Sequence, residues 1–436
     1  MHSFSIRSRI AHFSDTAPSR HDYGFTYIED GIIFVENGKI IDSGKAGEFQ
    51  RNGLDLAGCE HLPEHLILSG FIDAHVHAPQ VNIIGSYGEQ LLDWLKLYTF
   101  PAEIKFSKEE YSHIQTEKFI DALLANGTTS AMVFTTTFKH STEQLFKNAY
   151  DLDMRLITGK VLMDRNAPKA LLENPDTGTQ DCHELIKNWH NKGRLGYAIT
   201  PRFSGTSTPR QLAQAGELLR EYPDLWVQTH LSENKHEIAW TKKLFPDAKD
   251  YLDTYEQFGL HTNKTIFAHC LHLNESESSR IQSTGSSVAF CPSSNLFLGS
   301  GLFDMAHFKE RGIPVAICSD VGAGTSLSPF RTLGDAYKVC QLLGYSLNAK
   351  EAYFNASKGA AKALGIDQFV GNLDSGKEAD FIVINPKNMK SVHERTSTNN
   401  AIEDELFVYM TCGDERLIDR TYIAGNLVYE QCQEVS

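Results

Sequence analysis

Eight short, almost continuously apolar runs occupy the middle of the chain, and segments with the apolar spacing of helices separate them. Strands that are apolar along their whole length are typical of parallel sheets covered on both faces. Eight is also the number of strands that closes a (β/α) barrel. The runs lie at residues 66–77, 128–136, 155–163, 196–204, 225–233, 265–273, 287–295 and 314–320.

An open, doubly wound sheet is the rival architecture, and it usually carries a glycine-rich phosphate loop after a strand. No such loop follows any of the eight runs. Two intervening segments carry helix-start signals: residues 107–127 open with a Ser-x-x-Glu capping box at Ser107, and residues 208–222 open with Thr208 followed by proline. The pattern therefore predicts an α/β fold whose residues 66–370 form a (β/α)8 TIM-like barrel.

Both ends of the chain are rich in short β segments instead. Asn37-Gly38 lies between two β-rich runs and predicts a hairpin, because a type I′ turn needs positive φ at both central residues. Residues 371–386 and 419–430 have the pattern of short strands broken by Gly and Asp turns. We expect residues 1–65 and 371–436 to form one small β-sandwich domain together.

The composition excludes some classes of partner. The chain of 436 residues has 41 basic and 55 acidic residues and no long basic run, so binding to nucleic acid through its phosphates is not expected. No segment has the length and apolarity of a membrane span, and the first residues lack the apolar core of a secretory signal. The eight cysteines are scattered without a Cys-x-x-Cys pair, which predicts a reducing, cytoplasmic location.

Polar side chains suited to chemistry follow several of the apolar runs. The carboxyl ends of barrel strands meet at one mouth, so residues far apart in the sequence converge there. A single histidine at a strand end is more often a hydrogen-bonded structural residue, but such residues recur here from run to run. The candidates are His75, His77, Arg202, Phe203, His230, Glu233, His269 and Asp320.

Imidazoles combined with a carboxylate favour zinc or iron, because magnesium and calcium prefer shells of oxygen. The period of two in a strand places His75 and His77 on one face, where both could bind the same ion. Some barrels hold two ions bridged by a carboxylated lysine on a middle strand, but the fourth run ends in TPRFS (200–204), without a lysine. The sequence therefore predicts one ion per chain, zinc or alternatively iron.

These motifs resemble those of a known family. GFIDAHVH (70–77), FAHCLHL (267–273) and the Ser-Asp pair at 319–320 resemble the metal-dependent amidohydrolase superfamily, and THLSEN (229–234) resembles its deaminase branch. LLDWLKLYTFPAE (91–103), TPRFS and CPSSNLFLGSGLF (291–303) extend the resemblance to the guanine deaminases within that branch. It implies a homodimeric enzyme that hydrolyses the purine base guanine to xanthine and ammonia with a metal-activated hydroxide.

The same resemblance implies roles for the residues. Glu233 would pass a proton to the ring nitrogen beside the attacked carbon and later to the leaving amine, while Asp320 would also take a proton from the water. His269 would hydrogen-bond and orient the hydroxide, although the sequence leaves open whether it is a metal ligand instead. The ligands would be His75, His77, His230 and Asp320.

Recognition of the base would fall to Gln80, Arg202 and Phe203. An aromatic ring can stack on the purine, and an arginine can donate to the carbonyl oxygen of guanine but cannot accept from the amino group of adenine. The alternatives are core packing for Phe203 and a surface salt bridge for Arg202. Trp94 and Phe100 could close the pocket, but their helical setting favours plain packing.

Two other functions remain open from the sequence. The enzyme class could be right and the substrate another aminated heterocycle, such as a pterin, a triazine or cytosine. The barrel could also have lost its chemistry and serve as a scaffold, but such proteins typically lack several ligands, and here every ligand position and Glu233 are filled.

Overall fold

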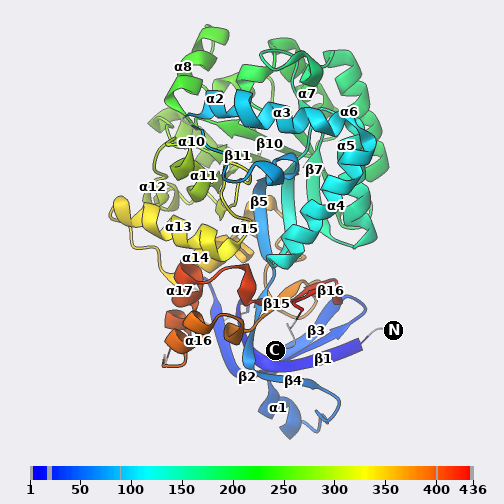
Figure 1. Ribbon diagram of the computed structural model, residues 1–436, viewed down its shortest axis with the longest axis vertical. Coiled ribbons are helices and arrows are strands. Elements are labelled where there is room, and N and C mark those ends of the chain that lie inside the picture. Colours follow the sequence, from blue (N-terminus) through cyan, green and yellow to red (C-terminus); the bar gives the residue numbers. More distant parts are fainter. Residues whose placement is uncertain (1–2, 17–21, 89, 399–400, 433–436) are drawn as a thin grey trace.

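The chain forms a barrel with a smaller β domain beside it, and both ends of the chain lie in the smaller part (Figure 1). The computed structural model describes residues 3–16, 22–88, 90–398 and 401–432. Among these residues, no helix is both long and apolar enough to cross a membrane.

The barrel strands follow one another in chain order, and all are parallel. Every residue of β5, β6, β9 and β11 is buried, as expected for strands covered on both faces. The eight strands are β5 (Phe71–His77), β6 (Thr128–Phe134), β7 (Arg155–Gly159), β9 (Leu195–Pro201), β10 (Trp226–Leu231), β11 (Thr265–His269), β12 (Ser287–Phe290) and β13 (Val315–Ile317), and the short β8 (Val161–Leu162) pairs with β9. The predicted barrel is thus confirmed.

Hydrogen bonds bring the last strand region against the first and nearly close the barrel. The amide of Asp320 donates to the carbonyl of His75 at 3.0 Å, and the amide of His77 donates to the carbonyl of Val321 at 2.9 Å. The segment after β13 is therefore held directly beside the end of β5.

Helices separate the strands along the chain, and several of them surround the barrel (Figure 1). They are α4 (Glu109–Ala125), α5 (Lys139–Asp151), α6 (Pro175–Trp189), α7 (Pro209–Glu221), α8 (Lys235–Leu244), α9 (Asp253–Glu256), α10 (Glu275–Thr284), α11 (Pro292–Phe297), α12 (Met305–Glu310), α13 (Pro329–Leu342), α14 (Ala349–Asn355) and α15 (Lys358–Leu364). Between β5 and α4 the chain also forms α2 (Leu91–Trp94), a π-helical turn (Leu95–Thr99) and α3 (Phe100–Ile104).

One of the two helix-start predictions is right. The Thr208 side chain accepts a hydrogen bond from the amide of Gln211 and caps α7. The capping box at Ser107 is wrong, because that residue ends a 3-10 turn and the N-cap of α4 is Lys108, whose side chain makes no capping bond. The 3-10 turn thus moves the helix start by one residue and removes the serine from the capping position.

The first apolar run, 66–77, belongs to two strands rather than one. β4 (Glu60–Ser69) lies in the smaller domain, and β5 begins at Phe71. Gly70 separates them, and a Cβ there would lie 2.1 Å from the Thr129 hydroxyl, so only glycine fits this close passage. The domain boundary expected after residue 65 falls within β4, and the division of the chain into domains stays a prediction.

The smaller domain is one continuous mixed sheet of strands from both chain ends, in the order β16-β15-β14-β4-β1-β2-β3. Asn37 and Gly38 have φ values of 50° and 78°, which confirms the predicted hairpin. The remaining elements are β1 (Ser3–Phe13), β2 (Phe25–Glu36), β3 (Lys39–Lys45), α1 (Ala46–Arg51), β14 (Phe381–Ile384), α16 (Lys390–Thr396), α17 (Ile402–Cys412), β15 (Ile418–Ile423) and β16 (Asn426–Glu430).

Candidate active site

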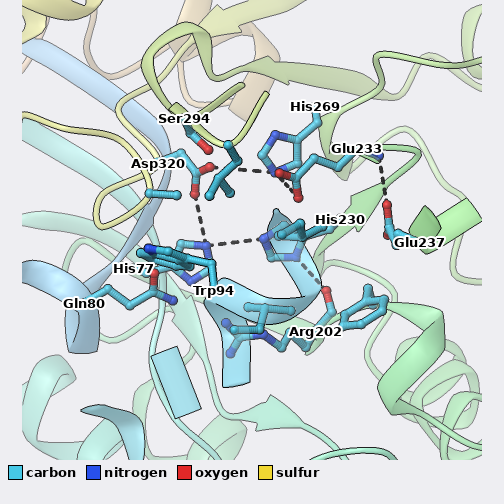
Figure 2. A pocket seen from close by; sticks show the side chains of 15 residues that line it. His77, Gln80, Trp94, Arg202, His230, Glu233, Glu237, His269, Ser294 and Asp320 are labelled. Carbon is cyan, nitrogen blue, oxygen red and sulfur yellow. Dashed lines mark hydrogen bonds and ion pairs between the residues drawn. The ribbon is translucent and has the colours of Figure 1, made fainter. Parts of the chain in front are cut away.

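The predicted strand ends meet in one buried cluster at the carboxyl end of the barrel (Figure 2). Each of His75, His230, His269 and Asp320 offers one ligand atom, and these atoms all lie within 4.8 Å of one another. His77 is also present, with its Nε2 3.2 Å from Asp320 Oδ1 and 3.3 Å from His230 Nε2. The structure therefore brings together all five residues that the sequence singled out around an ion.

Two of the histidines are held with one ring nitrogen directed at the cluster. His230 Nδ1 lies 2.7 Å from the carbonyl oxygen of Arg202, and His269 Nδ1 lies 2.9 Å from Oδ1 of Asn295. Both partners are hydrogen-bond acceptors here, so each Nδ1 donates and each Nε2 keeps its lone pair. This is the tautomer that a metal ligand needs.

The cluster also passes a simple test of fit to a metal. Among the residues that the structure describes, His75 Nε2 has no hydrogen-bond partner although the residue is buried, and it lies 3.2 Å from Asp320 Oδ1. A buried ring nitrogen without a partner costs free energy that an ion would recover. Imidazoles with one carboxylate are a donor set that suits zinc or iron.

The ionisation states agree with ligation. Burial lowers the pKa of His77 to about 3, and burial together with the neighbouring histidines lowers the pKa of His230 well below its usual value. Burial alone would raise the pKa of Asp320, but His75 and His77 hold it well below its usual range. His77 and His230 are thus neutral and Asp320 is ionised at neutral pH, as metal ligands must be.

The backbone is strained where the strands end. His269, Cys270 and Asp320 have φ values of 71°, 53° and 48°, and Ser232 has 51°. Residues with a side chain occupy this left-handed region rarely, and such strain concentrates at functional sites. It turns the chain sharply at the mouth of the barrel, where the His269 and Asp320 side chains reach the cluster.

Glu233 lies beside the cluster, with Oε2 3.4 Å from His269 Nε2. The Ser300 hydroxyl donates to its Oε1 at 3.1 Å. Burial and the nearby charge of Asp320 raise the pKa of Glu233 to about 8, so this carboxyl group carries a proton at neutral pH.

The loop bearing Glu233 is fixed by a second carboxylate. Glu237 Oε2 accepts hydrogen bonds from the amides of Glu233 at 3.0 Å and Asn234 at 3.1 Å, and its Oε1 accepts from the Tyr251 hydroxyl at 2.5 Å. Asn234 and Glu237 also form the capping box that starts α8. The helix start therefore fixes the position of the acid.

A pocket opens onto the cluster, and the three residues expected to recognise a base line it: Gln80, Arg202 and Phe203. Trp94 lines it as well while packing into an apolar cluster, so it does more than the plain packing that its helical setting favoured. Phe203 likewise combines both roles, since it is buried and packs against the Trp240 ring with centroids 5.9 Å apart.

Arg202 forms an ion pair, but not at the surface. Its Nη1 lies 2.7 Å from Oε1 of Glu103, and the two side chains are 3% and 0% exposed. The alternative of a surface salt bridge is therefore wrong. Gln80 Nε2 donates to the same carboxylate oxygen at 3.4 Å, and Gln80 Oε1 accepts from the Gly322 amide at 3.3 Å.

Three residues of this arrangement were not anticipated: Glu103, Glu237 and Asn295. The sequence carries a signal for Glu237, because Asn234-x-x-Glu237 has the spacing of a capping box. Glu103 and Asn295 lie in α3 and α11, and no local pattern relates them to the strand ends that they contact.

Comparison with known proteins gives a consistent result. The sequence pattern described as "Amidohydrolase family" matches residues 66–428. The guanine deaminase of Escherichia coli K12 is 47% identical over 405 residues, which cover 93% of this chain and 92% of that protein.

Solved structures agree with the sequence comparison. The structure of the E. coli guanine deaminase superimposes with a TM-score of 0.95 at 45% identity, covering 98% of this chain and all of that one. That of the guanine deaminase of C. acetobutylicum, which has guanine bound in its active site, superimposes with a TM-score of 0.88 at 31% identity, with 98% and 100% coverage.

Proposed function

Because the chain belongs to the amidohydrolase family, we infer that its buried cluster serves hydrolysis and that the enzyme converts guanine and water to xanthine and ammonia. A carbon–oxygen bond forms at the ring carbon that bears the amino group, and the carbon–nitrogen bond to that group then breaks. One observation carries this inference: the acid Glu233 and the purine-edge donor Arg202 line the same pocket as the cluster.

The cluster fits one zinc or iron ion. We assign as its ligands His75, His77, His230 and Asp320, and give His269 the task of orienting the attacking water. When bound, such an ion lowers the pKa of water so that hydroxide is available near pH 7. The position of His269 Nε2, 3.4 Å from Glu233 and 3.7 Å from Asp320, suits a group that hydrogen-bonds the water between two carboxyl groups.

Glu233 acts as the acid of the reaction. Its carboxyl group is protonated at neutral pH, so it can donate to the ring nitrogen beside the attacked carbon. The resulting carboxylate then takes a proton from the attacking water and passes it to the departing amine. Asp320 is ionised and can hold a proton of the water during the addition.

The pocket selects guanine through its donors. Arg202 has only N–H groups to offer, so it pairs with a carbonyl oxygen and leaves the amino group of adenine without an acceptor. Gln80 offers both a donor and an acceptor to the edge of the base. Phe203 lines the pocket, and stacking of a base on its ring would contribute roughly 1–3 kcal/mol.

A homodimer and a cytoplasmic location remain proposals, as do the choice between zinc and iron and the domain limits. The reducing compartment is supported by the cysteines, since all eight are unpaired. Light scattering of the purified protein would test the dimer.

A substrate panel tests the function. The protein should release ammonia from guanine much faster than from a pterin, a triazine or cytosine, and Arg202→Ala should reduce the preference for guanine. A higher kcat/KM for one of the other heterocycles would overturn the assignment of guanine as substrate.

A further inference from the structure

Glu103 is a buried carboxylate that the proposed reaction does not use. It lies in α3, is 0% exposed, and its carboxylate contacts two residues of the pocket wall. Its Oε1 accepts from Arg202 Nη1 at 2.7 Å and from Gln80 Nε2 at 3.4 Å. One oxygen atom thus connects two side chains proposed to read the substrate.

The terminal groups of Gln80 and Arg202 each have a second contact as well. The Gly322 amide donates to Gln80 Oε1 at 3.3 Å, so the amide group of Gln80 is held from both sides and its oxygen and nitrogen are distinguished. The guanidinium of Arg202 lies 5.7 Å from the centre of the Phe100 ring. Glu103 therefore completes a frame that leaves Arg202 and Gln80 little freedom to rotate.

A contribution to stability does not explain this ion pair well. Removing a carboxylate and a guanidinium from water costs about as much as their attraction returns, and apolar residues of similar size are often as good. Among the described residues, Glu103 Oε2 has no hydrogen-bond partner, which adds to that cost. The ion pair can instead hold a hydrogen-bond donor in one direction within a binding pocket, which apolar residues cannot do.

We propose that Glu103 is a positioning residue for substrate selection: it holds Arg202 and Gln80 in the orientation that pairs with the carbonyl-bearing edge of guanine. This inference rests on the proposed function, because it names how the same pocket chooses its substrate. Glu103 acts through the two side chains and not on the reacting atoms.

Glu103→Gln tests the proposal, with two purines as probes. Xanthine keeps the carbonyl group at the position where guanine has it, whereas 2-aminopurine lacks that group. The variant should raise the KM for guanine and the inhibition constant of xanthine by about tenfold or more, while the inhibition constant of 2-aminopurine changes by less than about threefold. A merely structural residue would weaken the two inhibitors equally, and that result would overturn the proposal.

A second variant covers the case in which Glu103→Gln does not fold because Arg202 loses its counter-charge. Glu103→Asp keeps the charge but draws the carboxylate back by one methylene, so it should fold and still lose the preference for xanthine over 2-aminopurine. Wild-type inhibition constants in Glu103→Asp would show that only the charge matters and would refute the positioning role.

The matched control is Glu378→Gln. Glu378 also accepts from a partly buried arginine, with 2.6 Å between its Oε1 and Arg155 Nη2, but it lies outside the pocket. This variant should leave all three constants unchanged. If the unaltered protein bound xanthine but did not deaminate guanine, the proposed function would fail, and dissociation constants of xanthine and 2-aminopurine measured by calorimetry would still test the role of Glu103.

Discussion

The capping carboxylate Glu237 offers the sharpest test of how the acid is held in place. Its side chain is 1% exposed and accepts three hydrogen bonds, from the amides of Glu233 and Asn234 and from the Tyr251 hydroxyl. Glu237→Ala removes all three acceptor contacts at once. It also releases the backbone that carries Glu233.

The magnitude follows from these contacts. A buried donor left without a partner costs about 1–3 kcal/mol, so three donors give roughly 3–6 kcal/mol of lost unfolding free energy if water replaces some of the bonds. Glu237→Gln is the control, because its amide oxygen can accept from the two backbone amides and its nitrogen can donate to the Tyr251 oxygen. That variant should lose only about 1 kcal/mol.

Urea unfolding and steady-state kinetics with guanine measure the two effects. We expect Glu237→Ala to unfold at a clearly lower urea concentration and to lose about tenfold or more in kcat, because a small misplacement of a reacting group is costly. Glu237→Gln should keep most of both. The reasoning is refuted if Glu237→Ala keeps the wild-type kcat, since the acid would then need no support from this carboxylate.

Three further predictions concern single residues. Glu233→Gln should lower kcat by about 10²–10⁴-fold with the metal content unchanged, and loss of the metal instead would mean that its role is misassigned. Asn295→Ala frees the Nδ1 of His269 and should reduce kcat/KM by about 10–100-fold, whereas unchanged kinetics would contradict the orienting role of Asn295. Burial lowers the pKa of His12 to about 4, and in the folded protein the neutral Nδ1 accepts a hydrogen bond from the Leu373 amide. Between about pH 6.5 and pH 4, His12 is therefore protonated in the unfolded chain but not in the folded one. The unfolding free energy should therefore fall by up to about 3 kcal/mol as the pH drops through this window, and His12→Asn should flatten that slope; an equal slope in both proteins would contradict it.

The barrel was predictable because its strands are buried on both faces, which leaves continuous apolar runs such as β6 and β9 in the sequence. Their polar ends indicated where the site would form, since the fold brings strand ends to one mouth. The division between β4 and β5 was not visible, because Gly70 interrupts an apolar run whose two halves belong to different sheets.

The supporting residues show where local patterns fail. Glu103 and Asn295 are tied to Arg202 and His269 only by contacts across the fold, so no spacing in the sequence indicates them. The choice between His77 and His269 as the third imidazole ligand is equally non-local, because both lie within ion-pair distance of Asp320. Such choices depend on side-chain direction, which strand periodicity alone does not determine.

The most direct measurement is metal content and guanine turnover on the same sample of purified protein. We expect about one equivalent of zinc or iron per chain, with activity that falls in proportion as a chelator removes the ion and returns when zinc is added back. Full turnover of guanine by protein stripped of metal would contradict the claim that these histidines and Asp320 hold an ion that the reaction needs.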